Sequence, residues 1–160
     1  MQQSIHDLQF LSDFLTKIKS DDYIVGMDNI SFSGSIGQHS RHIVEFYEQF
    51  LMTYQIGEIN YDLRKRNPTL ELNHLNCIGL IDDIISKLNH LDLIKDMPIK
   101  VTNNFSDHLS TVGRELMFLN EHAVHHLALI RIIAESKGYS FHEMENFGIS
   151  NSTLLYRKSN

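Results

Sequence analysis

Apolar residues recur three or four positions apart in four separate stretches of this chain, and this periodicity is the feature that most restricts its fold. Such spacing places the apolar side chains on one face of an α-helix, and that face has to be buried against another element. The stretch 68–91 shows strict alternation along one seam: Leu70, His74, Cys77, Ile81, Ile84, Leu88 and Leu91. We therefore predict four helices, over about 3–19, 36–56, 68–91 and 111–137.

Signals for helix ends support these boundaries. Ser35, with Gln38 three positions later, has the form of a capping box, in which a hydroxyl and an amide side chain satisfy free backbone N–H groups. Asn67 is a good cap residue, and Pro68 follows it at the first helical position, where a missing N–H costs nothing. Gly138 follows the last periodic stretch, and glycine is common just after a helix.

Four amphipathic helices of similar length predict an all-α fold, a four-helix bundle, and 160 residues are the size of one domain, 1–160. Residues 92–110 form the longest connection. It contains Pro98 and an alternating run at 99–102, so we expect a crossover before the fourth helix that includes a short strand. The tail, 139–160, lacks periodicity but carries apolar residues. We expect it to lie extended against the bundle or against a second subunit.

The composition indicates an ordinary globular protein. Hydrophobic residues make up 42% of the chain and charged residues 21%. The formal net charge is -6, and the basic cluster 64–66 is too small to follow a phosphate backbone, so nucleic acid is an unsuitable partner. No apolar run approaches the roughly 20 residues of a membrane span, and 1–6 do not resemble a secretion signal. With Cys77 as its lone cysteine, the chain fits a reducing cytoplasm.

The sharpest local signal is the pair His122 and His126, four positions apart on the helix expected over 111–137. That spacing lets two imidazoles face one ion. His126 also interrupts an apolar seam, and burying an unpaired imidazole costs about 1–3 kcal/mol. A metal, a buried carboxylate or a catalytic role would offset this cost. The alternative is a core histidine satisfied by a hydrogen bond. No glutamate follows His122, so the H-E-x-x-H signature of metalloproteases is not present.

A second pair, His39 and His42, lies three positions apart near the start of the helix expected over 36–56. If the helices are antiparallel with level ends, His42 lies roughly 10 Å from one end and His126 roughly 16 Å from the same end, at about 1.5 Å per residue. One ion could then be shared. The apolar stripe places His39 closer to the core than His42, and the residues alone leave the choice between the two open.

Other candidates rank lower. His74 lies on a seam and is expected as a core or supporting residue, whereas four histidines are expected at the surface or in loops: His6, His90, His108 and His142. Cys77 is interpreted as a small core residue rather than a nucleophile. Three glutamates near the histidine pairs could orient imidazoles through the second ring nitrogen, with a solvated helix face as the alternative for each: Glu45, Glu115 and Glu121.

The segment Ser35-Ile-Gly-Gln-His39-Ser-Arg-His42-Ile43, followed some eighty residues later by His122-Ala-Val-His125-His126, resembles the DinB/YfiT-like superfamily of metal-dependent enzymes. The resemblance covers about three quarters of the chain. It implies a four-helix bundle, often dimeric, in which three histidines bind nickel, zinc or a similar divalent transition metal. By motif these ligands fall on His42, His122 and His126. The resemblance therefore selects His42, with His39 as a fourth candidate.

Two classes of function are predicted. Three neutral histidines on a divalent ion leave a position open for water or a thiol, which favours a metal-dependent hydrolase or a thiol S-transferase acting on a small molecule. Some members of the superfamily resemble transferases that use low-molecular-weight thiols, and Glu45 is the candidate base or orienting residue. The alternative is a non-catalytic bundle with a structural metal or a partner-binding role that uses the tail. The resemblance also implies a homodimer.

Overall fold

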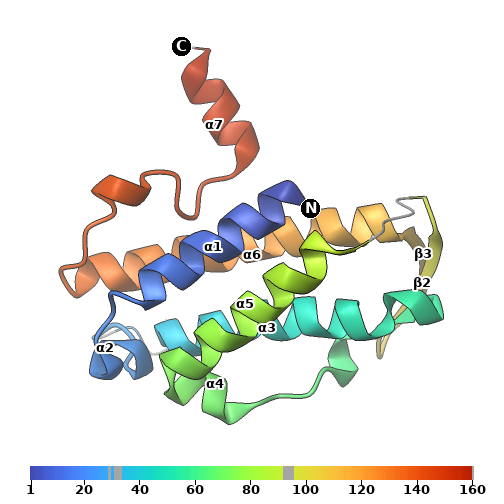
Figure 1. Ribbon diagram of the computed structural model, residues 1–160, viewed down its shortest axis with the longest axis horizontal. Helices are drawn as coiled ribbons and strands as arrows, with labels where there is room; N and C mark the ends of the chain where they lie inside the picture. The colour runs from blue at the N-terminus through green and yellow to red at the C-terminus, as the bar shows by residue number, and fades with distance from the viewer. Residues whose placement is uncertain (29, 31–33, 92–95, 160) are drawn as a thin grey trace.

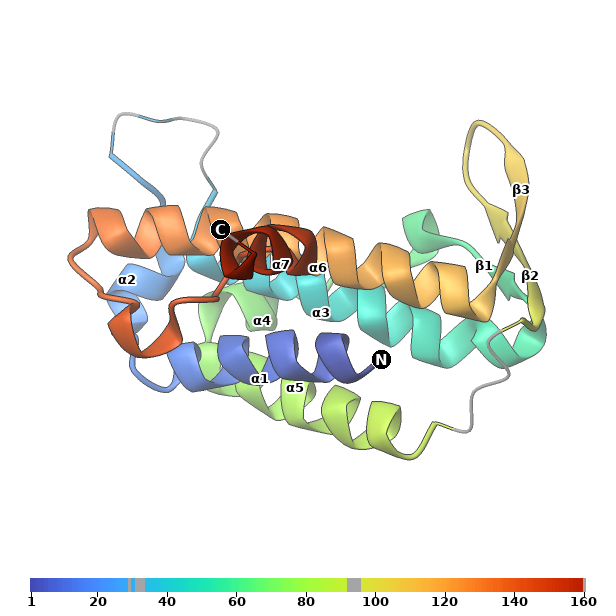
Figure 2. The same cartoon turned by 90° about the horizontal axis from the view of Figure 1, so that it is seen from above.

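Four long helices lie side by side and form the body of the molecule (Figures 1 and 2). The computed structural model describes residues 1–28, 30, 34–91 and 96–159. The four helices are α1 (Gln2–Leu15), α3 (Ile36–Thr53), α5 (His74–Asn89) and α6 (Val112–Ser136). Each of α1 and α3 packs against both α5 and α6, so the four apolar faces enclose one core. The expectation of a mostly helical chain is confirmed.

Shorter elements lie between these helices and after the last of them, and they make the fold more than the predicted all-α four-helix bundle. They are the helices α2 (Ser20–Ile24), α4 (Pro68–Leu72) and α7 (Asn151–Lys158), and the 3-10 turns η1 (Tyr54–Ile56), η2 (Tyr61–Leu63) and η3 (His142–Met144). The strands β1 (Glu58–Ile59), β2 (Pro98–Thr102) and β3 (Asp107–Thr111) form a small sheet in that order.

The helix predicted over 68–91 is interrupted at Asn73. This residue is extended, with φ -140° and ψ 108°, and its side chain accepts hydrogen bonds from the N–H groups of Leu75 and Asn76. Asparagine competes in this way with the helical hydrogen-bond pattern, so α4 ends and α5 begins at one residue. The apolar seam continues across the break. For this reason the spacing of apolar residues predicted a single helix.

Two other predicted helices end earlier than expected. The first ends at Leu15, and the residues up to 19 belong to the turn before α2. The helix expected over 36–56 ends at Thr53 and tightens into η1, after which Gly57 adopts a left-handed φ of 81°. The helix expected over 111–137 is observed as α6, Val112–Ser136.

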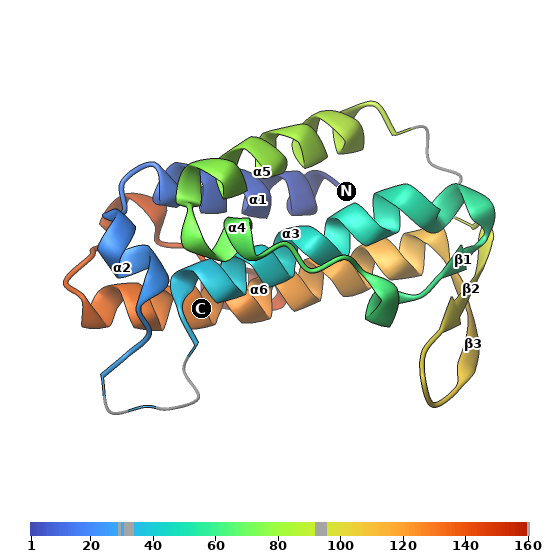
Figure 3. The same cartoon turned by 90° about the horizontal axis from the view of Figure 1, so that it is seen from below.

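The predicted strand within the crossover is confirmed as β2, although its partners were missed. β2 pairs antiparallel with β3, with Ile99 opposite Ser110, and parallel with β1, with Lys100 opposite Glu58. Residues 92–95 of the crossover lie outside the described residues. The sheet sits at the end of the bundle where α3 ends and α6 begins, and the β2–β3 hairpin projects beyond the helices (Figure 3).

The tail is not extended throughout. Phe141 and Phe147 are buried, and both rings pack against Phe14 of α1. Gly148 has a φ of 70° and lies so close to α6 that a Cβ there would come within 2.6 Å of the Ala128 nitrogen. The chain then forms α7, which has no buried residue and projects away from the bundle (Figure 1). Within the described residues, no helix combines the length and apolar character that a membrane span requires.

Candidate metal centre

Three histidines from two helices meet where α3 packs against α6. His42 of α3 and His122 of α6 approach with their Nε2 atoms 2.9 Å apart. The ring centroid of His126 lies 4.5 Å from that of His42 and 4.7 Å from that of His122. One ring nitrogen from each residue can be chosen so that all three lie within 4.8 Å of one another. These three residues are called the histidine cluster below.

The start of α3 is fixed firmly, and this determines where His42 lies. The capping box is present: Ser35 Oγ accepts from the N–H of Gln38 at 3.1 Å, and Gln38 Oε1 accepts from the N–H of Ser35 at 3.0 Å. At Gly37 the helix lies directly against α4, because a Cβ there would be 2.2 Å from the Glu71 carbonyl oxygen. Position 37 therefore has no room for a side chain.

His39 lies beside the cluster and contacts His126. Its Nδ1 is 2.9 Å from Nδ1 of His126, and their ring centroids are 5.2 Å apart. His42, by comparison, has ring contacts with both His122 and His126. The two histidines of α3 thus both reach α6, but His42 has the more central position.

The environment of the cluster keeps its rings neutral. Burial, together with the nearby His122 and Arg64, lowers the pKa of His42 to about 4. Burial, followed by His42 and His122, lowers the pKa of His126 to about 3, and burial followed by His125 also lowers the pKa of His122. Neutral imidazole is the form that binds metals. The three imidazoles could therefore hold a metal ion.

The cluster lies at the rim of the core rather than inside it. The prediction that His126 occupies a buried seam position is wrong by one residue, because Leu127 is the buried side chain there, 1% exposed, and His126 is only half-buried. An imidazole at this rim can retain contact with water, so the burial cost assumed from the sequence was too high.

Aromatic side chains cover one side of the cluster. The ring of Phe46 lies 4.7 Å from that of His42 and 4.6 Å from that of His122. Phe118 stacks on His122 at 5.6 Å, and Tyr61 stacks on Phe46 at 5.1 Å. Sequence analysis missed these rings. The signal was nevertheless present, since Phe46 lies four residues after His42 and Phe118 four residues before His122, a spacing that brings helical side chains together.

Glu45 is held by cations and a backbone group. It is 1% exposed; its Oε1 accepts from the N–H of Asn67 at 2.7 Å and lies 3.6 Å from Arg41 Nε, and its Oε2 lies 3.8 Å from Arg64 Nε. Arg64 in turn lies over the ring of Phe46, 4.7 Å from its centroid. Arg64 and Phe46 thus connect Glu45 to the cluster, and the use of Glu45 as a base stays a prediction.

The remaining candidates lie away from the cluster. His74 packs against the ring of Tyr23, and Cys77 is buried, which raises the pKa of its thiol to about 12 and leaves it unreactive. Glu115 accepts hydrogen bonds from hydroxyl groups described below, and Glu121 is exposed on α6.

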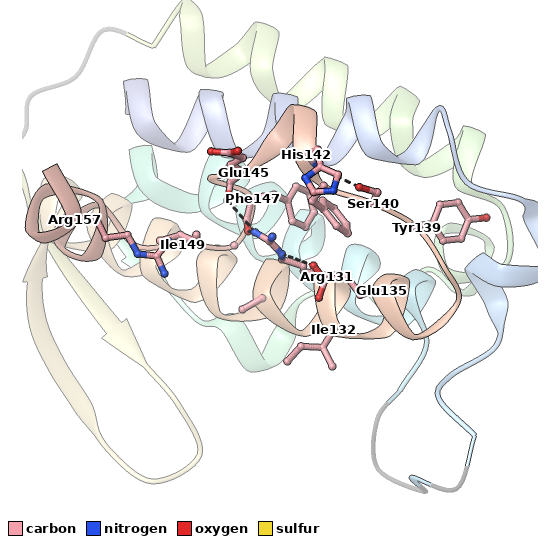
Figure 4. A pocket seen from close by; sticks show the side chains of 13 residues that line it. Arg131, Ile132, Glu135, Tyr139, Ser140, His142, Glu145, Phe147, Ile149 and Arg157 are labelled. Carbon is pink, nitrogen blue, oxygen red and sulfur yellow. Dashed lines mark hydrogen bonds and ion pairs between the residues drawn. The ribbon is translucent and has the colours of Figure 1, made fainter.

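A pocket of about 710 Å³ lies elsewhere, between the second half of α6 and the tail (Figure 4). Its central cation, Arg131, donates to the carbonyl oxygens of Glu145 and Phe147 and to Oε1 of Glu135. These bonds fasten the tail to α6 and leave the guanidinium few free donors. No member of the histidine cluster lines this pocket, so it is separate from the candidate metal centre.

Comparison with known proteins adds no family to this picture: no family model matches the chain, and no curated protein and no solved structure matches it. The feature that bears on function is therefore a cluster of three histidines, on a mostly helical scaffold, that could hold a metal ion.

Proposed function

We propose that this protein binds one divalent transition-metal ion, zinc or nickel, through His42, His122 and His126. The observation that carries the proposal is the convergence of three ring nitrogens within 4.8 Å from two helices. The lowered pKa values of these imidazoles support it, because their lone pairs are available to a cation at neutral pH.

We further propose that the bound ion serves a hydrolase or a thiol S-transferase acting on a small molecule. An ion with three imidazole ligands and an open position supplies Lewis acidity, which lowers the pKa of a water or thiol placed there. Phe46 and Phe118 pack against the ring of His122, and the three imidazoles are only half-buried. The resemblance of both histidine motifs to the DinB/YfiT-like superfamily agrees with this assignment.

A structural, non-catalytic metal is the second candidate, and His39 is the observation that favours it. Its Nδ1 lies 2.9 Å from Nδ1 of His126, so a small rotation of either side chain would offer the ion a fourth imidazole. Four protein ligands would leave no open position, as in structural zinc sites.

Metal analysis tests the proposal. The purified wild type, after incubation with zinc and dialysis, is expected to retain about one ion per chain. His42→Ala and His126→Ala are expected to retain much less. His125→Ala is the matched control, because His125 is exposed on the same helix and should leave the stoichiometry unchanged. If His126→Ala retains as much zinc per chain as the wild type, His126 is not a ligand of the ion.

A cobalt-substituted sample separates the catalytic from the structural candidate. The visible spectrum of cobalt depends on the ligands and the coordination number. If a position is open, adding a small thiol such as 2-mercaptoethanol is expected to change the spectrum. An unchanged spectrum would contradict the enzyme and support a closed four-histidine site, and His39→Ala would then be expected to restore the response.

A further inference from the structure

A pocket of about 380 Å³ lies beside the histidine cluster, under the β2–β3 hairpin. Residues of η2, the hairpin and the first two turns of α6 line it, among them Tyr61, Ser110, Arg114, Glu115 and Phe118. Its volume is within the range of pockets that bind small molecules. Tyr61 also stacks on Phe46, and Phe118 stacks on His122, so this pocket and the cluster share one aromatic wall.

The pocket contains a buried carboxylate that forms no ion pair with a described residue. Glu115 is only 7% exposed; it accepts from the Tyr61 hydroxyl at 3.0 Å and from the Ser110 hydroxyl at 2.6 Å. Within the described part of the chain, no ion pair involves Glu115. A buried carboxylate without a cation is costly, and two hydroxyl donors leave each oxygen able to accept a further hydrogen bond.

The other walls suit a positively charged group. The rings of Tyr61 and Phe118 lie with their centroids 5.6 Å apart and both line the pocket. Aromatic faces attract cations, most strongly where water is excluded. Arg114, an exposed residue, lines the same pocket, so the cationic group has to enter as a small headgroup that reaches Glu115 past the arginine.

We propose that this pocket binds a primary ammonium group of a small-molecule ligand, with Glu115 as its counter-ion and Tyr61 and Phe118 as its aromatic walls. Glu115 and His122 are seven residues apart on α6, which is two turns and about 10 Å along one helix face. A ligand anchored by its ammonium would therefore extend towards the cluster. Its role as a substrate rests on the proposed metal function, whereas ammonium binding itself does not.

Two probes of the same shape test the proposal. Benzylammonium and benzyl alcohol are titrated into the isotope-labelled wild-type protein, and backbone amide shifts are followed by NMR. Benzylammonium is expected to shift resonances of the pocket residues and to bind at least about tenfold more tightly than benzyl alcohol, because only the cation can pair with the buried carboxylate. Equal affinity of the two probes, or no shift at the pocket, would overturn the proposal.

Two variants test whether Glu115 supplies the negative charge that binds the ammonium group. Glu115→Gln keeps the size of the side chain but removes the charge, and about tenfold weaker benzylammonium binding is expected, with benzyl alcohol unaffected. Glu121→Gln removes an exposed carboxylate from the same helix and should bind as the wild type does. Unchanged benzylammonium binding in Glu115→Gln would contradict the assignment. If this variant does not fold, the comparison of the two probes on the wild type still decides.

The same titration of His126→Ala separates this proposal from the metal function. His126 does not line the pocket, so benzylammonium binding is expected to be retained in this variant even when the metal is lost. If a folded His126→Ala protein no longer binds benzylammonium, the probe does not bind in this pocket, and the proposal is wrong.

Discussion

Nε2 of His42 and Nε2 of His122 lie 2.9 Å apart, although the two residues are 80 positions apart in the sequence and belong to different helices. Both imidazoles have lowered pKa values, so the pair is neutral and can share only one proton between the facing nitrogens. A cation that replaces this proton would use both lone pairs. This relationship links the packing of α3 on α6 directly to the chemistry proposed for the cluster.

His39→Ala is expected to weaken zinc binding less than His126→Ala does. His39 approaches His126 with their Nδ1 atoms 2.9 Å apart and is a supporting residue in the proposed site. Removing such a supporting residue typically lowers metal affinity about 10- to 100-fold, whereas removing a ligand costs more. Competition with a zinc-binding dye measures both affinities. A loss in His39→Ala equal to that in His126→Ala would make His39 a ligand in its own right.

The stability of the metal-free protein is expected to fall as the pH is lowered from about 6.5. The pKa of His42 is lowered to about 4 and that of His126 to about 3, so the unfolded chain, with ordinary values, binds more protons in this range. The stabilising contribution of these two neutral imidazoles is complete above about pH 6.5 and is lost progressively towards about pH 3, the pKa of His126 in the folded protein. Urea unfolding measured across this range checks it. The double variant His42→Gln/His126→Gln should show a shallower dependence, and an identical dependence would contradict the prediction.

Glu45→Ala is expected to lower the free energy of unfolding by about 2 kcal/mol, because it leaves the Asn67 N–H without its acceptor and two partly buried arginines without their shared carboxylate. Zinc stoichiometry should stay at the wild-type value, since the described contacts of Glu45 do not include the cluster histidines. Denaturant unfolding and metal analysis of the same sample give both readings. A folded variant without metal would show that Glu45 acts on the site.

Gly37→Ala is expected to destabilise the protein and to weaken metal binding. A Cβ at position 37 would lie 2.2 Å from the Glu71 carbonyl oxygen, and backbone at that distance has to move, which displaces the first turn of α3 and with it His39 and His42. Gly79→Ala is the matched control. Nothing lies within 4 Å of the added Cβ in α5, so a gain of about 0.5–1 kcal/mol in unfolding free energy is expected there. Thermal unfolding compares the two, and a neutral Gly37→Ala would contradict the close approach.

Helix formation and the pairing of the histidines could be predicted because both depend on local spacing. His122 and His126 face one way for the same reason that the seam residues do, and the capping box at Ser35 and Gln38 marked the start of α3 correctly. The prediction that a histidine of α3 reaches this pair followed from antiparallel helices with level ends, and the distances agree with it.

Other features depend on contacts that spacing does not encode. At Asn73 the seam continues through a helix break, so only the side-chain hydrogen bonds reveal it. The position of His126 at the rim depends on how α6 is rotated against α3, and one residue of error moves the buried position to Leu127. The partners of Glu115 come from η2 and β3, and a carboxylate in the first turn of a helix gives no sign of them.

The cluster also has a consequence for how the chain acquires its native state. Its two halves are separated by α4, α5 and the hairpin, so the three nitrogens come together only after a large loop has closed. An isolated α3 or α6 segment holds at most part of the ligand set. Because the assembled site exists only in the folded topology, an ion would bind the native chain in preference to the unfolded ensemble, and raising its concentration would shift the folding equilibrium by mass action.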